Sequence, residues 1–177
     1  MRSQAREARR WASGQADAYR QGEQRPLRGY AAAMGVYSLL VGGAAAWARL
    51  MGRHAPKRVG PWDVVLLGVA THKVSRLLSK DAVTSPLRAP FVRYRGPGGP
   101  AEVQEEVREH GGVKHAVGEL TSCPFCLAQW VATGFVAGSV LAPGPTRLAA
   151  TTFAAIAVSD SLQFGYAALE RLASGDT

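Results

Sequence analysis

The chain has 177 residues, a length that fits a single domain, and it carries a formal net charge of +8 with a sequence pI of about 10.1. It contains only two cysteines, which excludes the disulfide framework of a small secreted fold. The mean hydropathy of -0.05 averages very basic, polar segments with long uncharged ones. Such a chain suits an anionic lipid surface or a nucleic acid, and the placement of the charges must decide between them.

Residues 1–28 are basic and polar. They contain seven arginines and three acidic residues with little apolar content. We therefore predict a disordered arm on the cytoplasmic side of a membrane. We expect this arm to bind anionic lipid headgroups. Nucleic acid is not favoured, because the sequence offers neither a nucleic-acid-binding fold nor an aromatic platform.

The first long apolar run is YAAAMGVYSLLVGGAAAWA, Tyr30–Ala48, which has 19 residues without a charge. At about 1.5 Å per residue, a helix of this length crosses the hydrocarbon core of a bilayer. The end of the run, at residues 46–48, resembles a signal-peptide cleavage site. The long polar stretch before it and the further apolar runs after it favour an uncleaved signal anchor.

Two further apolar runs lie close together in the second half of the chain. They are Phe125–Ala142 and Leu148–Ala168, and the second has Asp160 as its only charge. The Pro-Gly-Pro sequence at 143–145 predicts a tight turn between them. We therefore predict a transmembrane hairpin here.

The segment Trp62–Lys80 is shorter and more polar. Its uninterrupted apolar stretch covers only Val64–Thr71, and Lys73, Arg76 and Lys80 recur on one stripe at helical spacing. We predict a fourth, amphipathic membrane helix that either crosses the membrane or lies along the interface. If it crosses, 16 of the 21 lysines and arginines lie on one side, which the positive-inside rule identifies as the cytoplasm. Both termini are then cytoplasmic.

Residues 81–118 form a cytoplasmic connection in this topology. DAVTSPLRAPFVRYR is basic, GPGGP is a flexible break, and AEVQEEVREHGG predicts a short acidic helix. The predicted fold class is all-α: an integral membrane helical bundle with three spans and a shorter fourth helix. Residues 29–177 form this single helical membrane domain.

The sequence THKVSRLLSKDAVTSPLRAPFVRY, followed later by GELTSCPFCLAQWVA, resembles a family of bacterial integral membrane proteins. This is the domain of unknown function family numbered 1360. The likeness covers about residues 62–168 and leaves the arm and the first span outside. The resemblance implies a small multi-pass protein of the bacterial cytoplasmic membrane, and it implies no activity or mechanism.

The cysteines Cys123 and Cys126 stand in the sequence CPFC at the start of an apolar run. A helix N-terminus favours a thiolate, so redox chemistry is one interpretation, although the strand–helix context of redox proteins is missing. Two histidines, His110 and His115, could complete a metal site with the thiols. The favoured interpretation is structural: both cysteines pack at the helix start, with Ser122 as the N-cap. We therefore predict no cofactor, with a metal ion as the alternative.

Asp160 is the most informative charge, because a carboxylate within a membrane span needs a partner or water. Lys73 and Arg76 are expected on the same side, so we predict a buried ion pair between Asp160 and one of them. A functional polar pocket is the alternative. Further polar residues expected at that end are Lys80, Arg88 and Glu119. They form either a cavity with surplus positive charge for an anionic headgroup or a solvated rim.

The sequence contains no nucleotide-binding loop, hydrolase motif, zinc-protease helix or paired acid–base set. We therefore expect a non-enzymatic membrane anchor or adaptor that presents the arm and the 81–118 connection to a cytoplasmic protein partner. Gly134 and Gly138 form a GxxxG pair, which packs helices within the chain or between copies of a homo-oligomer.

Two alternative functions stay open. One is a membrane thiol redox or metal-binding protein that uses Cys123 and Cys126. The other is a small lipid-binding or transport-like protein that uses Asp160 with Lys73 or Arg76. Replacing the cysteines with serine separates the first alternative from an anchor, since an anchor needs no thiol.

Overall fold

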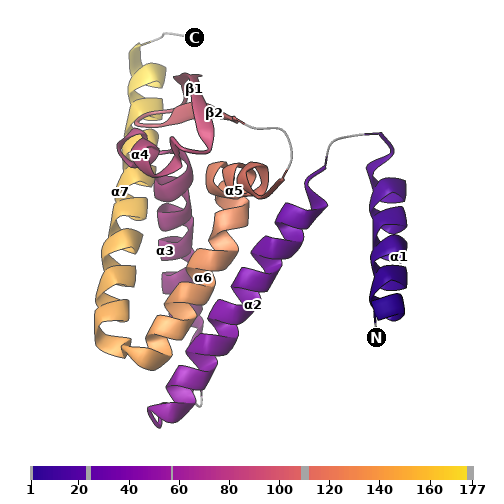
Figure 1. The fold of residues 1–177 in the computed structure, drawn as a ribbon. Coiled ribbons are helices and arrows are strands. Elements are labelled where there is room, and N and C mark those ends of the chain that lie inside the picture. The colour runs from indigo at the N-terminus through magenta and orange to yellow at the C-terminus, as the bar shows by residue number, and fades with distance from the viewer. Residues whose placement is uncertain (1, 23–24, 57, 109–111, 175–177) are drawn as a thin grey trace.

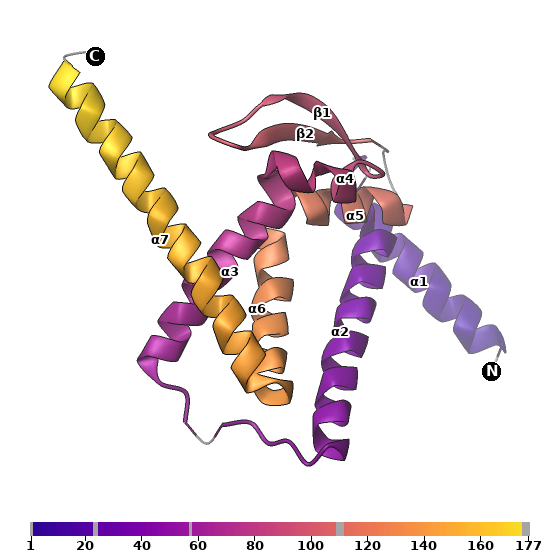
Figure 2. The same cartoon turned by 90° about the vertical axis from the view of Figure 1, so that its left-hand side faces the viewer.

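The computed structural model describes residues 2–22, 25–56, 58–108 and 112–174, and helices make up 78% of them. The bundle consists of α2 (Leu27–Leu50), α3 (Pro61–Lys80), α6 (Pro124–Leu141) and α7 (Pro143–Ser174), drawn in Figure 1. α2 and α6 run away from one end of the bundle, and α3 and α7 run back toward it (Figure 2). The segment 62–80 thus passes from one end of the bundle to the other, in the way that the crossing alternative requires.

A small unit, which we call the cap, covers the end of the bundle where α3 finishes. It consists of η1 (Ala82–Thr84), α4 (Ser85–Arg88), β1 (Val92–Pro97), β2 (Val103–Val107) and α5 (Gly112–Ser122). The two strands pair antiparallel, with an irregularity between Tyr94 and Gly96. Figure 2 shows the hairpin lying across the end of the bundle, beside α4 and α5.

The hairpin corrects the all-α prediction, and β2 replaces the acidic helix expected in AEVQEEVREHGG. Along β2, the whole residues Val103, Glu105 and Val107 are partly covered, and the Glu105 side chain is buried, whereas Gln104 and Glu106 are exposed. This alternation has the period of two that a strand facing the protein on one side requires. The first two residues of the GPGGP sequence end β1 and the other three lie in the turn to β2, so the sequence connects paired elements instead of separating independent ones.

The N-terminal arm also differs from the prediction, because Arg2–Arg20 form the helix α1. Alanine, arginine, glutamine and glutamate are good helix formers, and they dominate this segment. Low apolar content led to the prediction of disorder, yet a helix can form without a broad apolar face. Trp11 and Tyr19 on α1 are both exposed. α1 lies to the side of α2 (Figure 1).

The junction between α6 and α7 is shorter than predicted, because only Ala142 separates the two helices. The Pro-Gly-Pro sequence at 143–145 is the first turn of α7 rather than a loop. Proline is tolerated there because the first N–H groups of a helix have no partner within the helix. α7 continues to Ser174, and its C-terminal half leans away from the other helices (Figure 2).

α3 lies between α6 and α7 and packs along both. Its buried residues are small: Ala70, Thr71, Ser75 and Ser79. Small side chains let helices approach closely. The Ser79 hydroxyl donates to the Ser75 carbonyl at 2.7 Å, so this hydroxyl is bonded although it is buried. On the other side of α6, the Tyr37 hydroxyl of α2 lies 2.7 Å from the Thr133 Oγ1.

Among the described helices, α2 and α6 are long and apolar enough to cross a membrane, with mean hydropathies of 1.5 and 1.4 over 18-residue windows. Only 6% and 0% of these windows, respectively, is buried within the chain. Length and composition therefore agree with two of the three predicted spans, Tyr30–Ala48 and Phe125–Ala142. The third predicted span, Leu148–Ala168, lies in α7. Neither α7 nor α3 is apolar enough to meet the same test of length and hydropathy. Polar residues such as Asp160 and Gln163 lower the hydropathy of α7.

Candidate functional site

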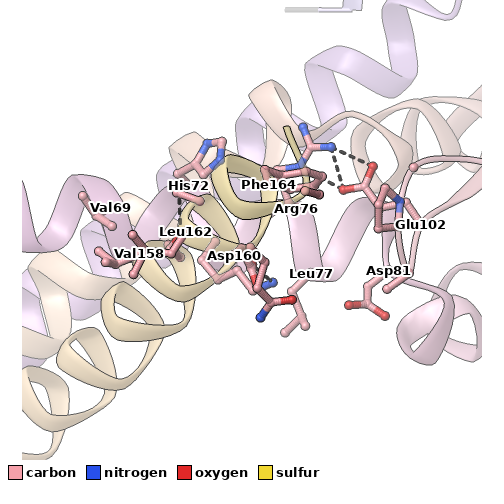
Figure 3. Close-up of a pocket in the computed structure, with 18 of the residues that line it drawn as sticks. Val69, His72, Arg76, Leu77, Asp81, Glu102, Val158, Asp160, Leu162 and Phe164 are labelled. Atoms are coloured by element: carbon pink, nitrogen blue, oxygen red, sulfur yellow. Dashed lines mark hydrogen bonds and ion pairs between the residues drawn. The ribbon is translucent and has the colours of Figure 1, made fainter. Parts of the chain in front are cut away.

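A cleft of about 1210 Å³ lies between α3 and the C-terminal half of α7, and the turn of the hairpin closes one end of it. Figure 3 shows Val69 and Val158 toward one end of the cleft and Glu102 and Asp81 toward the other. The cleft is therefore apolar at one end and charged at the end nearest the cap.

The ion pair between Lys73 and Asp160 joins α3 to α7 within this cleft. Lys73 Nζ donates to Asp160 Oδ2 at 2.7 Å, and both side chains are partly exposed. Of the two basic residues predicted as partners of Asp160, the structure thus places Lys73 against it. The pair lines an open cleft, whereas the prediction described it as buried.

Arg76, the other predicted partner, binds Glu102 in the hairpin turn instead. Arg76 Nη2 donates to both carboxylate oxygens of Glu102, at 2.6 and 2.7 Å, and Nε donates to Oε1 at 2.9 Å. Within the described residues, Nη1 of Arg76 makes no hydrogen bond, and the side chain is 43% exposed. This guanidinium therefore fixes the hairpin turn to α3 and still has donors to offer.

Arg88 lies outside the cleft, in the buried centre of the cap. Its side chain is 1% exposed and that of Glu105 is 5% exposed, and Arg88 Nε donates to Glu105 Oε2 at 2.6 Å. The other guanidinium nitrogens donate to the carbonyl oxygens of Leu78 and Asp81, at 2.8 and 3.0 Å, and to the Thr84 hydroxyl at 2.7 Å. Arg88 therefore fastens α4, the hairpin and the end of α3 to one another.

The remaining predicted members of a polar cavity do not join the cleft. Lys80 is half-buried in the last turn of α3, and Glu119 lies on α5. Glu119 accepts a hydrogen bond of 2.5 Å from the Tyr30 hydroxyl of α2, and His115 Nε2 lies 3.3 Å from its other oxygen. The cleft lining contains none of Lys80, Arg88 and Glu119. The cleft therefore does not carry the surplus of positive charge that was predicted for this end of the bundle.

The CPFC cysteines form the N-terminus of α6. Cys123 is the N-cap, and its sulfur accepts a hydrogen bond of 3.3 Å from the Cys126 backbone N–H. The predicted N-cap, Ser122, is instead the last residue of α5, where its hydroxyl donates to the Gly118 carbonyl at 2.8 Å. The two cysteine side chains interact with each other, but Cys123 is half-buried and Cys126 is exposed, so the pair does not form a buried site.

A metal site would need ligands in addition to these two thiols. Of the two histidines considered, His115 lies on α5 beside Glu119, and His110 falls outside the described residues. In the part of the chain that the structure describes, no group of three or more histidine, cysteine, aspartate and glutamate side chains is placed to hold a metal ion. Two thiols supply half of a tetrahedral zinc site, and the described geometry brings no second pair to them.

Glu102 and Glu105 are structurally important residues that the sequence reasoning missed. Both lie in the segment interpreted as an acidic helix, and each binds an arginine from the other side of the GPGGP turn. The signal for them was the alternation in VQEEV opposite the basic VRYR, which is typical of two paired strands.

Comparisons with known proteins identify the family of this chain but no activity, ligand or partner. The comparison with curated proteins and the comparison with solved structures each found no significant match. Residues 66–166 match a family described as "Protein of unknown function (DUF1360)", and they include the cap, α6, most of α3 and all of the α7 residues that line the cleft except Ala167. Since the match covers more than half of the chain and includes both the cleft and the cap, the protein belongs to the DUF1360 family.

Proposed function

We propose that this protein is a non-enzymatic, multi-pass protein of the bacterial cytoplasmic membrane that acts as an anchor or adaptor for a cytoplasmic protein partner. The observation that carries the proposal is the cap, whose elements are held together by the buried pair of Arg88 and Glu105. A surface that recognises a protein must keep its side chains in one geometry, and a fully bonded buried guanidinium provides that rigidity.

Membrane insertion is supported by the exposure of the apolar helices. In a soluble protein, a helix as apolar as α2 or α6 is usually buried on most of its surface. Here Leu39 and Leu40 of α2 and Val136 of α6 are exposed. Lipid chains are the environment that suits such surfaces, and the start of α2, the end of α7 and the cap lie toward the same end of the bundle (Figure 2).

α1 supports the assignment of that side to the cytoplasm. Arg6 and Arg10 lie on one face of the helix, while Trp11 and Tyr19 lie on another. A helix with this division lies along a membrane surface, with its arginines toward anionic headgroups and its aromatic rings toward the acyl chains. The arginine excess of this segment also matches the positive-inside rule.

The surface of the cap is the docking site in this proposal. Val83, Leu87 and Tyr94 are large apolar residues of the cap, and each is at least 65% exposed. Arg93 and Arg95 flank Tyr94 on β1 and are also exposed. Exposed aromatic and aliphatic side chains among arginines are typical of protein interfaces.

The orientation can be tested with single cysteines in a variant that has serine at both native cysteine positions. We expect Gln104→Cys, on an exposed position of the cap, to react with a membrane-impermeant maleimide only after the cells are permeabilised. Ala55→Cys, in the loop after α2, should react in intact spheroplasts. The measurement is the mass shift of the labelled protein on a gel. Equal reaction of both cysteines in intact spheroplasts would contradict the proposed orientation.

The adaptor function predicts contact with a protein at the cap. We expect a photo-crosslinking amino acid at Tyr94 to give one discrete protein adduct in cells. The same group at Leu39, which is exposed on the apolar surface of α2, should give none. The adduct is measured by immunoblotting of the tagged chain. The adaptor proposal fails if Val83, Leu87 and Tyr94 all give no protein adduct while the chain is correctly inserted.

A further inference from the structure

The cleft between α3 and α7 has an amphipathic lining that runs along α3. Val69 and Asp81 mark its two ends and are twelve residues apart in sequence, or about 18 Å at 1.5 Å per helical residue. The cleft volume of about 1210 Å³ exceeds the roughly 300–1,000 Å³ of ordinary small-molecule pockets. This shape accommodates a polar head at the cap end and an apolar chain at the other.

The charged end contains more carboxylates than cations. Its ionised side chains are Lys73, Arg76, Asp81, Glu102 and Asp160. Lys73 pairs with Asp160 and Arg76 pairs with Glu102, so Asp81 is the carboxylate of this cleft that neither cation binds. Asp81 accepts a hydrogen bond of 3.0 Å from the Val83 N–H, and among the described residues no cation is paired with it. A purely anionic ligand would add to this negative surplus, whereas a ligand with an ammonium group offsets it.

The two cations nevertheless keep hydrogen-bond donors for an anionic group. Nη1 of Arg76 makes no hydrogen bond within the described residues. Lys73 Nζ has three N–H groups, and Asp160 accepts from Nζ in the one hydrogen bond described for it. A phosphate can therefore bind at these positions without breaking either ion pair, while Asp81 stays available to a cation.

We propose that this cleft binds an aminophospholipid with a zwitterionic phosphoethanolamine head. The phosphate binds Arg76 and Lys73, the ammonium group donates to Asp81, and the acyl chain lies along Val158 and Leu162. A primary ammonium is favoured over the quaternary ammonium of choline, because Asp81 accepts hydrogen bonds and a quaternary nitrogen has no N–H to donate.

An acyl chain has a direct route into the cleft. Leu162 and Phe164 line the cleft and are 69% and 57% exposed, so the lining continues onto the outer apolar surface of α7. Tyr166 and Leu169 extend this exposed surface further along α7. A lipid in the surrounding bilayer can therefore place its head in the cleft while its chains remain beside α7. This inference depends on the membrane location proposed above and not on the adaptor role.

The test is native mass spectrometry of the purified chain in a non-ionic detergent. Phosphatidylethanolamine, phosphatidylcholine and phosphatidylglycerol with identical acyl chains are the probes. We expect the apparent Kd for phosphatidylethanolamine to be about tenfold lower than for the other two lipids, since one charge-assisted hydrogen bond separates them. Asp81→Asn should abolish this preference, because the asparagine oxygen can still accept from Val83 but has no charge.

The matched control is Arg147→Gln. Arg147 pairs with Asp63 at the opposite ends of α7 and α3 from the cap, and it is exposed. This variant should keep the full preference. Equal affinities for the three lipids, or tighter binding of phosphatidylglycerol, would overturn the proposal, as would an equal effect of Arg147→Gln.

Thermal unfolding followed by circular dichroism checks that each variant is folded. If Asp81→Asn fails to fold, Arg76→Gln serves in its place, since it removes the positive charge and the guanidinium that bind the phosphate and should weaken phosphatidylethanolamine binding about tenfold. The lipid preference of the unaltered chain is a test in its own right. Because the experiment uses purified protein, its failure would leave the adaptor role at the cap untouched.

Discussion

Replacing Arg88 with methionine is expected to destabilise the cap by about 3–5 kcal/mol, the range for removing one partner of a buried ion pair. The Arg88 side chain is 1% exposed, and its Nε and Nη2 donate to the two carboxylate oxygens of Glu105 at 2.6 and 3.2 Å. Methionine fills part of the volume but has no donor, so the carboxylate of Glu105 would remain buried without its partner.

The same substitution removes the hydrogen bonds that Arg88 makes at the end of α3. The carbonyl groups of Leu78 and Asp81 lie at or just beyond the helix C-terminus, where the backbone offers no intrahelical donor. A cation there also interacts favourably with the helix dipole. The effect of Arg88→Met should therefore extend from the hairpin into the last turn of α3, while α2 keeps its stability.

Hydrogen–deuterium exchange in detergent measures this local effect. A loss of about 3–5 kcal/mol accelerates exchange of the β1 and β2 amides by about two to four orders of magnitude. The control is Arg95→Met on the same hairpin, because the Arg95–Glu106 pair is at least half exposed on both sides. An exposed pair contributes about 0–1 kcal/mol, so exchange should change less than tenfold. Equal effects of the two variants would contradict the role assigned to Arg88.

The contact between Asp160 and Lys73 shows what a sequence can predict. One carboxylate within an apolar run requires a partner, and the basic residues of the segment 62–80 were the nearest candidates by topology. The sequence did not distinguish Lys73 from Arg76, because the choice depends on the rotation of α3 against α7. Arg76 turns toward the hairpin, where Glu102 binds it.

The hairpin was not predicted because it is recognised by the pairing of two segments, β1 and β2, rather than by the pattern within either one. VQEEV is too short for its alternation to outweigh a helical interpretation, and the acidic residues of such a segment also suit a helix surface. Glu105 becomes buried only because Arg88 approaches it from 17 residues away in the chain. Long-range partners of this kind decide which polar residue is buried, and a single sequence does not contain them.

The CPFC motif illustrates a boundary error of one residue. Serine is a common N-cap, so Ser122 was the expected residue. α5 continues through Ser122, and the chain turns only at Cys123, because Ser122 and Thr121 bond back to carbonyl groups of α5 instead. The predicted start of α6 was therefore correct to within a residue or two, whereas the predicted N-cap residue, Ser122, was wrong.

Gly29→Ala is expected to destabilise the protein by about 1–3 kcal/mol, the usual cost of overpacking a tight contact. A Cβ atom at Gly29 would lie 2.6 Å from the Ala116 Cβ and 2.6 Å from the Gly112 carbonyl oxygen. The carbonyl oxygen of Gly112 is a backbone atom of α5, so it cannot move aside as the end of a flexible side chain can. The two helices would have to separate, which also lengthens the hydrogen bond between Tyr30 and Glu119.

Gly35→Ala on the same helix should act in the opposite direction. A Cβ at Gly35 meets nothing within 4 Å, so alanine adds only its higher helix propensity, about 0.5–1 kcal/mol in favour of folding. Denaturant midpoints in detergent, with the tyrosine and tryptophan signals as readout, measure both changes. If both variants are stabilised, α2 does not pack on α5 as described. α2 lies outside the residues 66–166 that match the family. The contact between α2 and α5 therefore decides whether α2 is packed on the family domain or only connected to it by the chain.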